Sequence, residues 1–144
     1  MRVWHSAEID LQALTRLGEN ALPGYIGIEF VAIGDDWLTA RMPVDRRTHQ
    51  PFGRLHGGAS VALAETVGSI AGSLTVDPAV SLVVGMEINA NHIRPAKDGW
   101  VYGTARAEAL GRTTQVWTIR IVDEQDRLIC LSRITLAVIP VHRA

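Results

Sequence analysis

The pattern of hydrophobic and polar positions is most regular in a run of twenty-one residues, 56–76, which contains one carboxylate, Glu65, and no lysine or arginine. At about 100° per residue, the large side chains of this run form one helical stripe. The stripe consists of Leu63, Val67, Ile70 and Leu74. Such a stripe is typical of a helix that packs one face on a core. The run therefore predicts a long helix, with Glu65 on the side opposite the stripe.

The side of the predicted helix that carries Glu65 is small and uncharged. Its other members are Gly58, Val61, Ala62, Gly68, Ser69 and Gly72. A helix face in water normally carries charged side chains, whereas small residues let another backbone or a ligand approach closely. We therefore expect a partner subunit or a substrate to cover this face, with Glu65 at the interface. A structural glutamate that pairs with an arginine is the alternative, and a carboxylate in mid-span disfavours a membrane helix.

Shorter patterns predict a further helix and about six strands. The helix covers 10–17, residues 22–24 break it, and the strands cover 25–33, 37–43, 80–93, 100–109, 113–123 and 128–139. Because only the short segments 97–99, 111 and 124–126 separate the last four strands, we expect consecutive strands to pair antiparallel. The 144 residues suffice for one domain with a core. We predict a single α+β domain, 1–144, with a long central helix wrapped by an antiparallel sheet.

Composition narrows the class of protein. Acidic and basic residues are interspersed and the formal net charge is −1, which argues against nucleic acid as a partner. One cysteine, Cys130, excludes an internal disulfide and is typical of a reducing compartment. The first residues lack the apolar stretch of a secretory signal. We therefore expect a cytoplasmic protein without a membrane or nucleic-acid partner.

Candidate chemistry lies where the loop 44–55 leads into the long helix. The first amides of a helix lack intrahelical acceptors and lie at the positive end of its dipole, so they stabilise a developing negative charge. Gly57 is the candidate oxyanion donor, while Gln50 and His56 can donate hydrogen bonds nearby. The Glu65 backbone lies on the order of 10 Å further along. Because a helical side chain leans towards the N-terminus, we expect Gly57 and Glu65 to flank one carbonyl.

The sequence from His56 to Glu65, with two glycines after the histidine and the glutamate nine residues beyond it, resembles the helix of the hotdog-fold acyl-CoA thioesterases. The resemblance is to the 4-hydroxybenzoyl-CoA thioesterase-like branch, which handles aryl thioesters. It covers nearly the whole chain through the segments 34–36, 42–45, 50–53, 84–92 and 115–117. It implies the hotdog fold and hydrolysis of acyl-CoA thioesters, with aroyl groups favoured.

The resemblance also implies a role for each matching position. The helix glutamate, here Glu65, acts as nucleophile or general base, and the amide of Gly57 polarises the thioester carbonyl. Gln50 and His56 hold the thioester oxygen and the water or leaving group. The implied substrate contacts are Ser69 by the acyl group, Gly85, His92 and Arg94 along the acyl and pantetheine arm, and Leu110, Gly111 and Arg112 by the nucleotide.

Thioester hydrolysis suits these side chains, because an oxyanion donor and a carboxylate lower its barrier and thiolate leaves readily. Neither a metal nor a separate cofactor is expected, since the histidines and Cys130 lack the spacing of a zinc site. The family implies dimers that share active sites and pair into a homotetramer. A dehydratase of 3-hydroxyacyl thioesters and a non-catalytic acyl-CoA-binding module stay open as functions. So does an acyl or aryl carrier protein in place of coenzyme A.

Overall fold

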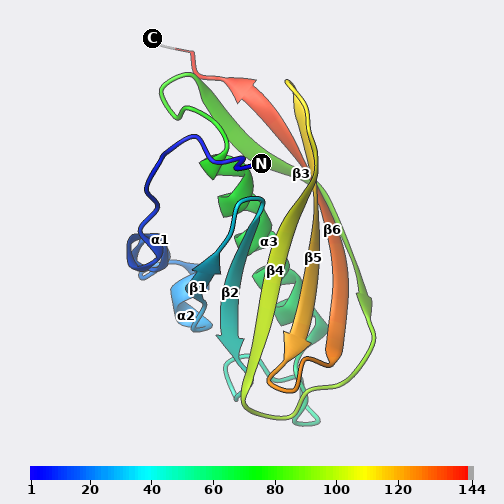
Figure 1. Cartoon of the computed structure of the whole chain (residues 1–144). Coiled ribbons are helices and arrows are strands. Elements are labelled where there is room, and N and C mark those ends of the chain that lie inside the picture. The colour runs from blue at the N-terminus through cyan, green and yellow to red at the C-terminus, as the bar shows by residue number, and fades with distance from the viewer. Residues whose placement is uncertain (143–144) are drawn as a thin grey trace.

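One long helix, α3 (Gly57–Leu74), packs against a six-stranded antiparallel sheet in the computed structural model, which describes residues 1–142 (Figure 1). The strands are β1 (Glu29–Ile33), β2 (Trp37–Pro43), β3 (Ser81–His92), β4 (Trp100–Leu110), β5 (Thr114–Asp123) and β6 (Leu128–Pro140). Their order in the sheet is β1-β2-β4-β5-β6-β3. The predicted α+β architecture, a hotdog fold with its helix against an antiparallel sheet, is confirmed.

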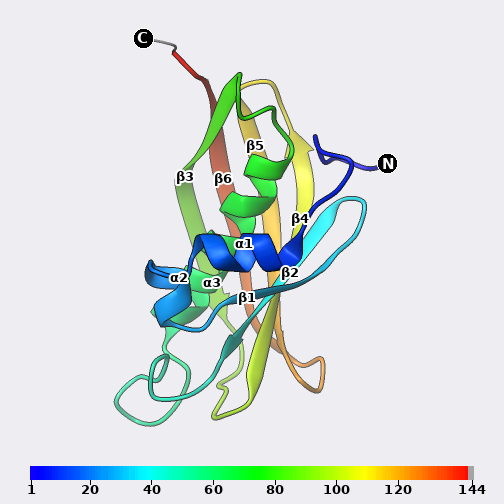
Figure 2. The ribbon, with the colours of Figure 1, turned by 90° about the vertical axis from the view of Figure 1, so that its left-hand side faces the viewer.

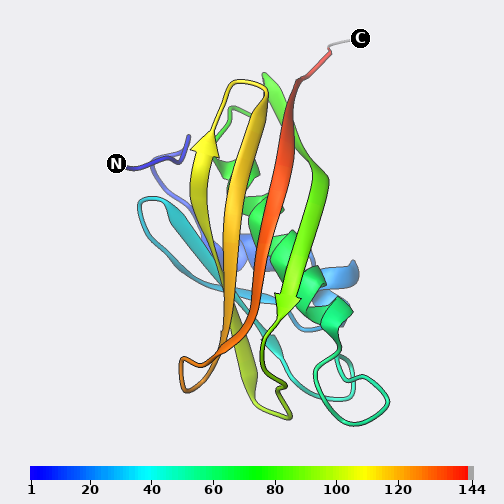
Figure 3. The same ribbon diagram turned by 90° about the vertical axis from the view of Figure 1, so that its right-hand side faces the viewer.

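Strand β3 pairs with β6 and not with β4, so the expected pairing of consecutive strands was wrong at this point. Because β3 ends at His92, seven residues, 93–99, connect it to β4, and these cross the end of the sheet instead of turning back. The pairings of β4 with β5 and of β5 with β6 agree with the prediction. As a result β3 forms one outer edge of the sheet (Figure 3).

The N-terminal region contains two short helices beside β1 and α3 (Figure 2). Helix α1 (Leu11–Leu17) begins at Asp10, whose carboxylate accepts two amide hydrogen bonds of the first turn. Helix α2 (Leu22–Tyr25) lies where we expected a break followed by a strand, and β1 starts only at Glu29. Pro23 fits in this first helical turn because proline has no N–H to donate and its φ is already helical.

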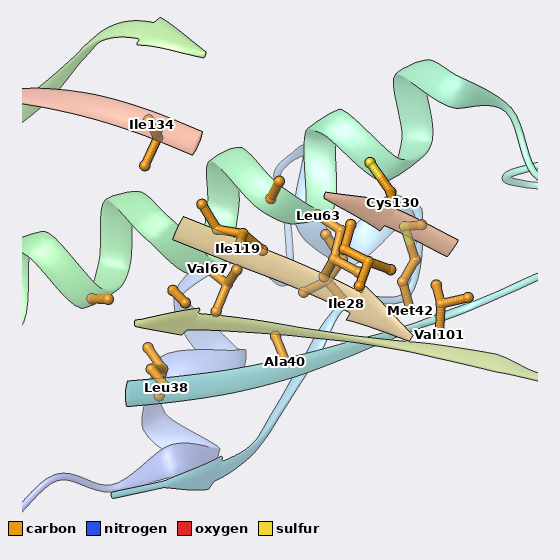
Figure 4. Close-up of a cluster of buried hydrophobic side chains, with 14 of the residues drawn as sticks. Ile28, Leu38, Ala40, Met42, Leu63, Val67, Val101, Ile119, Cys130 and Ile134 are labelled. Atoms are coloured by element: carbon orange, nitrogen blue, oxygen red, sulfur yellow. The ribbon is translucent and has the colours of Figure 1, made fainter. Parts of the chain in front are cut away.

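The large side chains of α3 enter the core as predicted. Leu63 and Val67 are fully buried among side chains of four strands, including Leu38, Ile119 and Ile134 (Figure 4). Ile70 and Leu74 are partly buried against the same cluster. Within residues 1–142, no helix is long and apolar enough to span a membrane.

The glycines of α3 face the sheet of their own chain. Gly68 and Gly72 are buried, and a Cβ atom added to Gly68 would lie 2.8 Å from Cγ2 of Ile134. A Cβ atom on Gly72 would collide with Leu136 in the same way. The expectation that these two residues lie under a partner subunit was therefore wrong. Their small size lets α3 approach β5 and β6 closely.

The packing at Gly68 predicts a cost for any larger side chain. Gly68→Val should lower the free energy of unfolding by about 1–3 kcal/mol, because Ile134 has no room to retreat in a packed core. Urea denaturation measures this difference. Ser73→Ala, on the exposed side of the same helix, is the control and should stay within about 0.5 kcal/mol of the wild type. Equal stability of the Gly68→Val protein would contradict the packing described here.

Candidate active site

The loop before α3 is fixed to its neighbours by backbone hydrogen bonds. The N–H of Leu55 donates to the carbonyl of Ala96 at 2.8 Å, and the N–H of His56 donates to the carbonyl of Thr48 at 2.8 Å. Thr48 is itself buried, with its hydroxyl bonded to backbone carbonyls. The start of α3 is therefore held in a defined position, as a site for a developing charge requires.

His56 caps the first turn of α3. Its Nδ1 accepts the Gly58 N–H at 2.8 Å, so Nδ1 carries no proton and the neutral ring keeps its proton on Nε2. Within residues 1–142 the Gly57 N–H has no hydrogen-bond acceptor. The first turn thus leaves the amide of Gly57 free for a ligand, as the sequence predicted. The His56 ring, which the sequence assigned to the substrate, also caps the helix.

A pocket of about 360 Å³ surrounds Gly57 and is called the Gly57 pocket below. Four of the predicted residues line it, namely Gln50, Gly57, His92 and Arg94. The His92 ring packs so closely on Gly57 that an added Cβ atom would lie 2.9 Å from its Nε2. Gln50 accepts the Phe52 N–H with its Oε1, which leaves its two Nε2 protons to donate. His56 does not line this pocket.

Glu65 lies two turns further along α3, in a second group of predicted residues. The Ser69 hydroxyl donates to Glu65 Oε1 at 3.2 Å, and a Cβ atom added to Gly85 of β3 would lie 2.6 Å from the same oxygen. We call these three residues the Glu65 cluster. Within residues 1–142 no lysine, arginine or histidine forms an ion pair with Glu65. The alternative of a structural glutamate paired with an arginine therefore has no support in this chain.

The structure does not bring Gly57 and Glu65 to one carbonyl within a single chain. Glu65 is absent from the lining of the Gly57 pocket, and its carboxylate lies against Gly85 instead of leaning to the helix start. Eight residues of helix separate the two positions, a rise of about 12 Å. The expected shared carbonyl is not met within one chain. The two groups lie apart along the line where α3 meets β3, and we call them the two candidate half-sites.

The predicted nucleotide contacts lie at the other end of the molecule. Leu110, Gly111 and Arg112 are exposed in the turn between β4 and β5 (Figure 1). That turn is next to the C-terminal end of α3, where Gln115 donates to the Thr75 hydroxyl at 2.8 Å. In one chain these three residues therefore do not reach the Gly57 pocket.

Two groups near the site have shifted pKa values. The guanidinium of Arg47 donates to both oxygens of Asp45 and lowers the pKa of that carboxyl, so this acid stays ionised and bound in the loop. Burial raises the pKa of the Cys130 thiol, which lies opposite His92 in the pairing of β6 with β3. A thiol that stays protonated is a poor nucleophile.

The sequence did not single out Arg54 and Ser60, which also line the Gly57 pocket. Ser60 lies one turn into α3 and is buried, a position that a helical pattern assigns to packing. Arg54 follows a glycine in the loop, where an arginine is usually a solvated surface residue. The feature of the sequence that could have indicated Arg54 is its position two residues before His56, the histidine of the motif.

Comparison with known proteins now bears on these half-sites. Residues 52–130 match the thioesterase superfamily model. The 1,4-dihydroxy-2-naphthoyl-CoA hydrolase of Escherichia coli is 52% identical over 137 residues, covering 95% of this chain and 99% of that protein. The proofreading thioesterase EntH of Cronobacter turicensis is 50% identical over 136 residues, covering 94% and 98%. A thioesterase crystal structure from Haemophilus influenzae superposes with a TM-score of 0.94 at 50% identity, covering 98% of this chain and 97% of that one.

The fold, a long helix wrapped by an antiparallel sheet, is the hotdog architecture, and the matching relatives are thioester hydrolases. The chain belongs to the thioesterase superfamily. The expected family and enzyme class are confirmed. The comparisons do not assign roles to individual residues, so the predicted site residues stay predictions.

Proposed function

We propose that this protein hydrolyses aryl-CoA thioesters to the free acid and coenzyme A, at a site made from the Gly57 pocket of one subunit and the Glu65 cluster of another. The observation that carries this proposal is the Gly57 N–H, which has no acceptor within the described residues and belongs to a pocket. An aryl acyl group is supported by the Escherichia coli relative, whose name gives a naphthoyl-CoA as its substrate.

The chemistry follows from the groups present. Attack on the thioester carbonyl creates an oxyanion, and the Gly57 amide, at the positive end of the α3 dipole, stabilises it. Gln50 Nε2 supplies a second donor in the same pocket. Glu65 acts as the nucleophile or as the base that activates water. The thiolate leaves without strong acid assistance, so no further proton donor is needed at the sulfur.

The edge strand β3 supports the pairing of two subunits. It is twelve residues long, and Leu82, Val84 and Met86 on it are 51%, 43% and 64% exposed. Such an edge offers unpaired N–H and C=O groups to another chain. In an antiparallel self-pairing with its twofold axis at Asn89, and with the bulge after Gly85 counted as one position, Gly85 of one subunit lies opposite His92 of the other.

That register brings the two half-sites together, because Gly85 contacts Glu65 and His92 contacts Gly57. Both Gly85 and His92 pair with buried residues of β6, Leu136 and Cys130, so both face the helix side of the sheet. Two composite sites per dimer result. We further propose that dimers pair into a tetramer, consistent with exposed apolar residues such as Ile139, and that the protein is cytoplasmic, as its free thiol Cys130 favours.

The catalytic role of Glu65 has a direct test. Glu65→Gln keeps the shape and removes the charge, so it should lower kcat by roughly 10²–10⁴-fold and change KM only a few-fold. His56→Ala should cost less, because the ring does not line the Gly57 pocket. Steady-state release of coenzyme A from benzoyl-CoA, followed with a thiol reagent, measures both. More than a tenth of the wild-type kcat in Glu65→Gln would end the assignment.

The composite site has a test of its own. Glu65→Gln and Gln50→Ala subunits should each be weakly active alone, and unfolding and refolding them together should restore about a quarter of the wild-type activity, since half of the dimers then hold one intact site. Refolding each variant alone is the control. If mixing restores nothing while native mass spectrometry shows mixed dimers, the carboxylate and the oxyanion donor act within one chain.

Substrate class is decided by a panel of acyl groups. The ring would lie beside the Glu65 cluster, where the Ser69 hydroxyl oxygen can accept a hydrogen bond, and not against Gly68 and Gly72, which the sheet covers. We expect kcat/KM for benzoyl-CoA to exceed that for acetyl-CoA by at least about tenfold, and Ser69→Ala to reduce any preference for hydroxylated rings.

Acetyl-, hexanoyl-, benzoyl- and hydroxynaphthoyl-CoA form the panel. Turnover of acetyl-CoA equal to that of benzoyl-CoA would refute the aryl assignment and leave hydrolysis intact. The panel also separates the other functions, because a dehydratase or a binding module releases no free thiol.

A further inference from the structure

Arg54 stands at the boundary of the Gly57 pocket. It lines that pocket and also a neighbouring hollow of about 380 Å³, so its side chain lies between the two. Its backbone is fixed, since the Gln50 N–H donates to the Arg54 carbonyl at 2.7 Å. The side chain is half-buried and belongs to the same rigid loop that positions the start of α3.

The guanidinium of Arg54 has no carboxylate partner within residues 1–142. Its one hydrogen bond goes to the carbonyl of the preceding Gly53, at 3.5 Å. Four other arginines form ion pairs with carboxylates at 2.7–2.8 Å, namely Arg41, Arg47, Arg106 and Arg127. Asp98 and Glu124 line the neighbouring hollow together with Arg54, and neither forms an ion pair with it. The donors of Arg54 are therefore available to a ligand.

Arg94 of the same pocket is also without a carboxylate partner within residues 1–142. It lines the Gly57 pocket from the segment after β3, and within residues 1–142 its guanidinium forms one hydrogen bond, to the Leu128 carbonyl at 3.5 Å. Two guanidinium groups from separate segments thus border one pocket without a carboxylate partner. Guanidinium groups bind phosphate oxygens through paired hydrogen bonds, and such charge-assisted bonds are the stronger ones in proteins.

The orientation of the thioester in the site determines which anionic group of the substrate lies near Arg54 and Arg94. On the proposed function, the acyl group points from Gly57 to the Glu65 cluster, so the Gly57 pocket receives the thiol side of the thioester. The thiol arm of coenzyme A, and of a carrier protein, is a pantetheine that ends in a phosphate. The neutral part of the arm passes the amide of Gly57, and its charged end lies towards the outer rim, where Arg54 separates the two hollows.

We propose that Arg54 is a specificity-determining residue that binds the phosphate of the pantetheine arm, with Arg94 as the second guanidinium of the pocket. This inference rests on the proposed thioesterase function. On this proposal, Arg54 makes the enzyme select thioesters of phosphorylated thiols over thioesters of neutral thiols. This selectivity depends on the local positive charge of Arg54 and not on the net charge of −1 of the whole chain. Arg54 acts on the binding of substrate and leaves the reacting carbonyl to Gly57.

The experiment compares Arg54→Gln and Arg54→Lys on three substrates that share one acyl group: benzoyl-CoA, benzoyl-phosphopantetheine and benzoyl-pantetheine. Arg54→Gln should lower kcat/KM about tenfold for the first two through KM, and change benzoyl-pantetheine less than about twofold. Arg54→Lys should recover part of the loss as a point charge. Arg46→Gln, an exposed arginine of the same loop outside the pocket, is the matched control and should leave all three unchanged.

Each result has a distinct meaning. A loss shared by benzoyl-CoA and benzoyl-phosphopantetheine assigns Arg54 to the phosphate that carrier proteins also have. A loss confined to benzoyl-CoA assigns Arg54 to the nucleotide end and overturns its role at the phosphate of the pantetheine arm. An equal loss on all three substrates, or no loss on any, overturns the role of Arg54. If the wild type releases no thiol from any of the substrates, the thioesterase proposal fails instead.

Discussion

The close contact between α3 and the sheet is the constraint on which the rest of the structure depends. Gly68 and Gly72 allow the helix to lie directly on Ile134 and Leu136, with Leu63 and Val67 filling the core beside them. Because a helix is rigid over this length, its position at the glycines also fixes where Gly57 and Glu65 stand against β3. A shift of the helix by an ångström would move both functional groups together.

The same closeness recurs at the two half-sites, where α3 meets β3. At each contact one partner is a glycine and the other is a side chain that the sequence predicts for the site. Gly57 of the helix receives the His92 ring of the strand, and Gly85 of the strand receives the Glu65 carboxylate of the helix. A methyl group at either glycine would push the side chain that it meets, so these glycines serve the orientation of His92 and Glu65 and also the approach of a ligand.

Much of this arrangement follows from local rules. The stripe of Leu63 and Val67 and the short helix near 10–17 were predictable because each depends on residues within one or two helical turns. The positions of Gly68 and Gly72 were not, because a small residue suits a tight contact with the sheet of its own chain as well as with a partner. Which of the two occurs depends on the shape of Ile134 and Leu136, more than sixty residues away.

The position of β3 in the sheet also depends on residues that are distant in the sequence, because β3 pairs with β6, and this position affects the site. The polar groups along the outer side of β3 and its exposed Met86 are unfavourable in a lone subunit, and the carboxylate of Glu65 is separated from the free amide of Gly57 in that same subunit. In the proposed pairing, the β3 strand of a second subunit adds to this edge. The added strand satisfies the exposed backbone groups of β3 and also brings the two half-sites together. Assembly then controls catalysis by mass action, since a dilute subunit has an oxyanion donor without a carboxylate beside it.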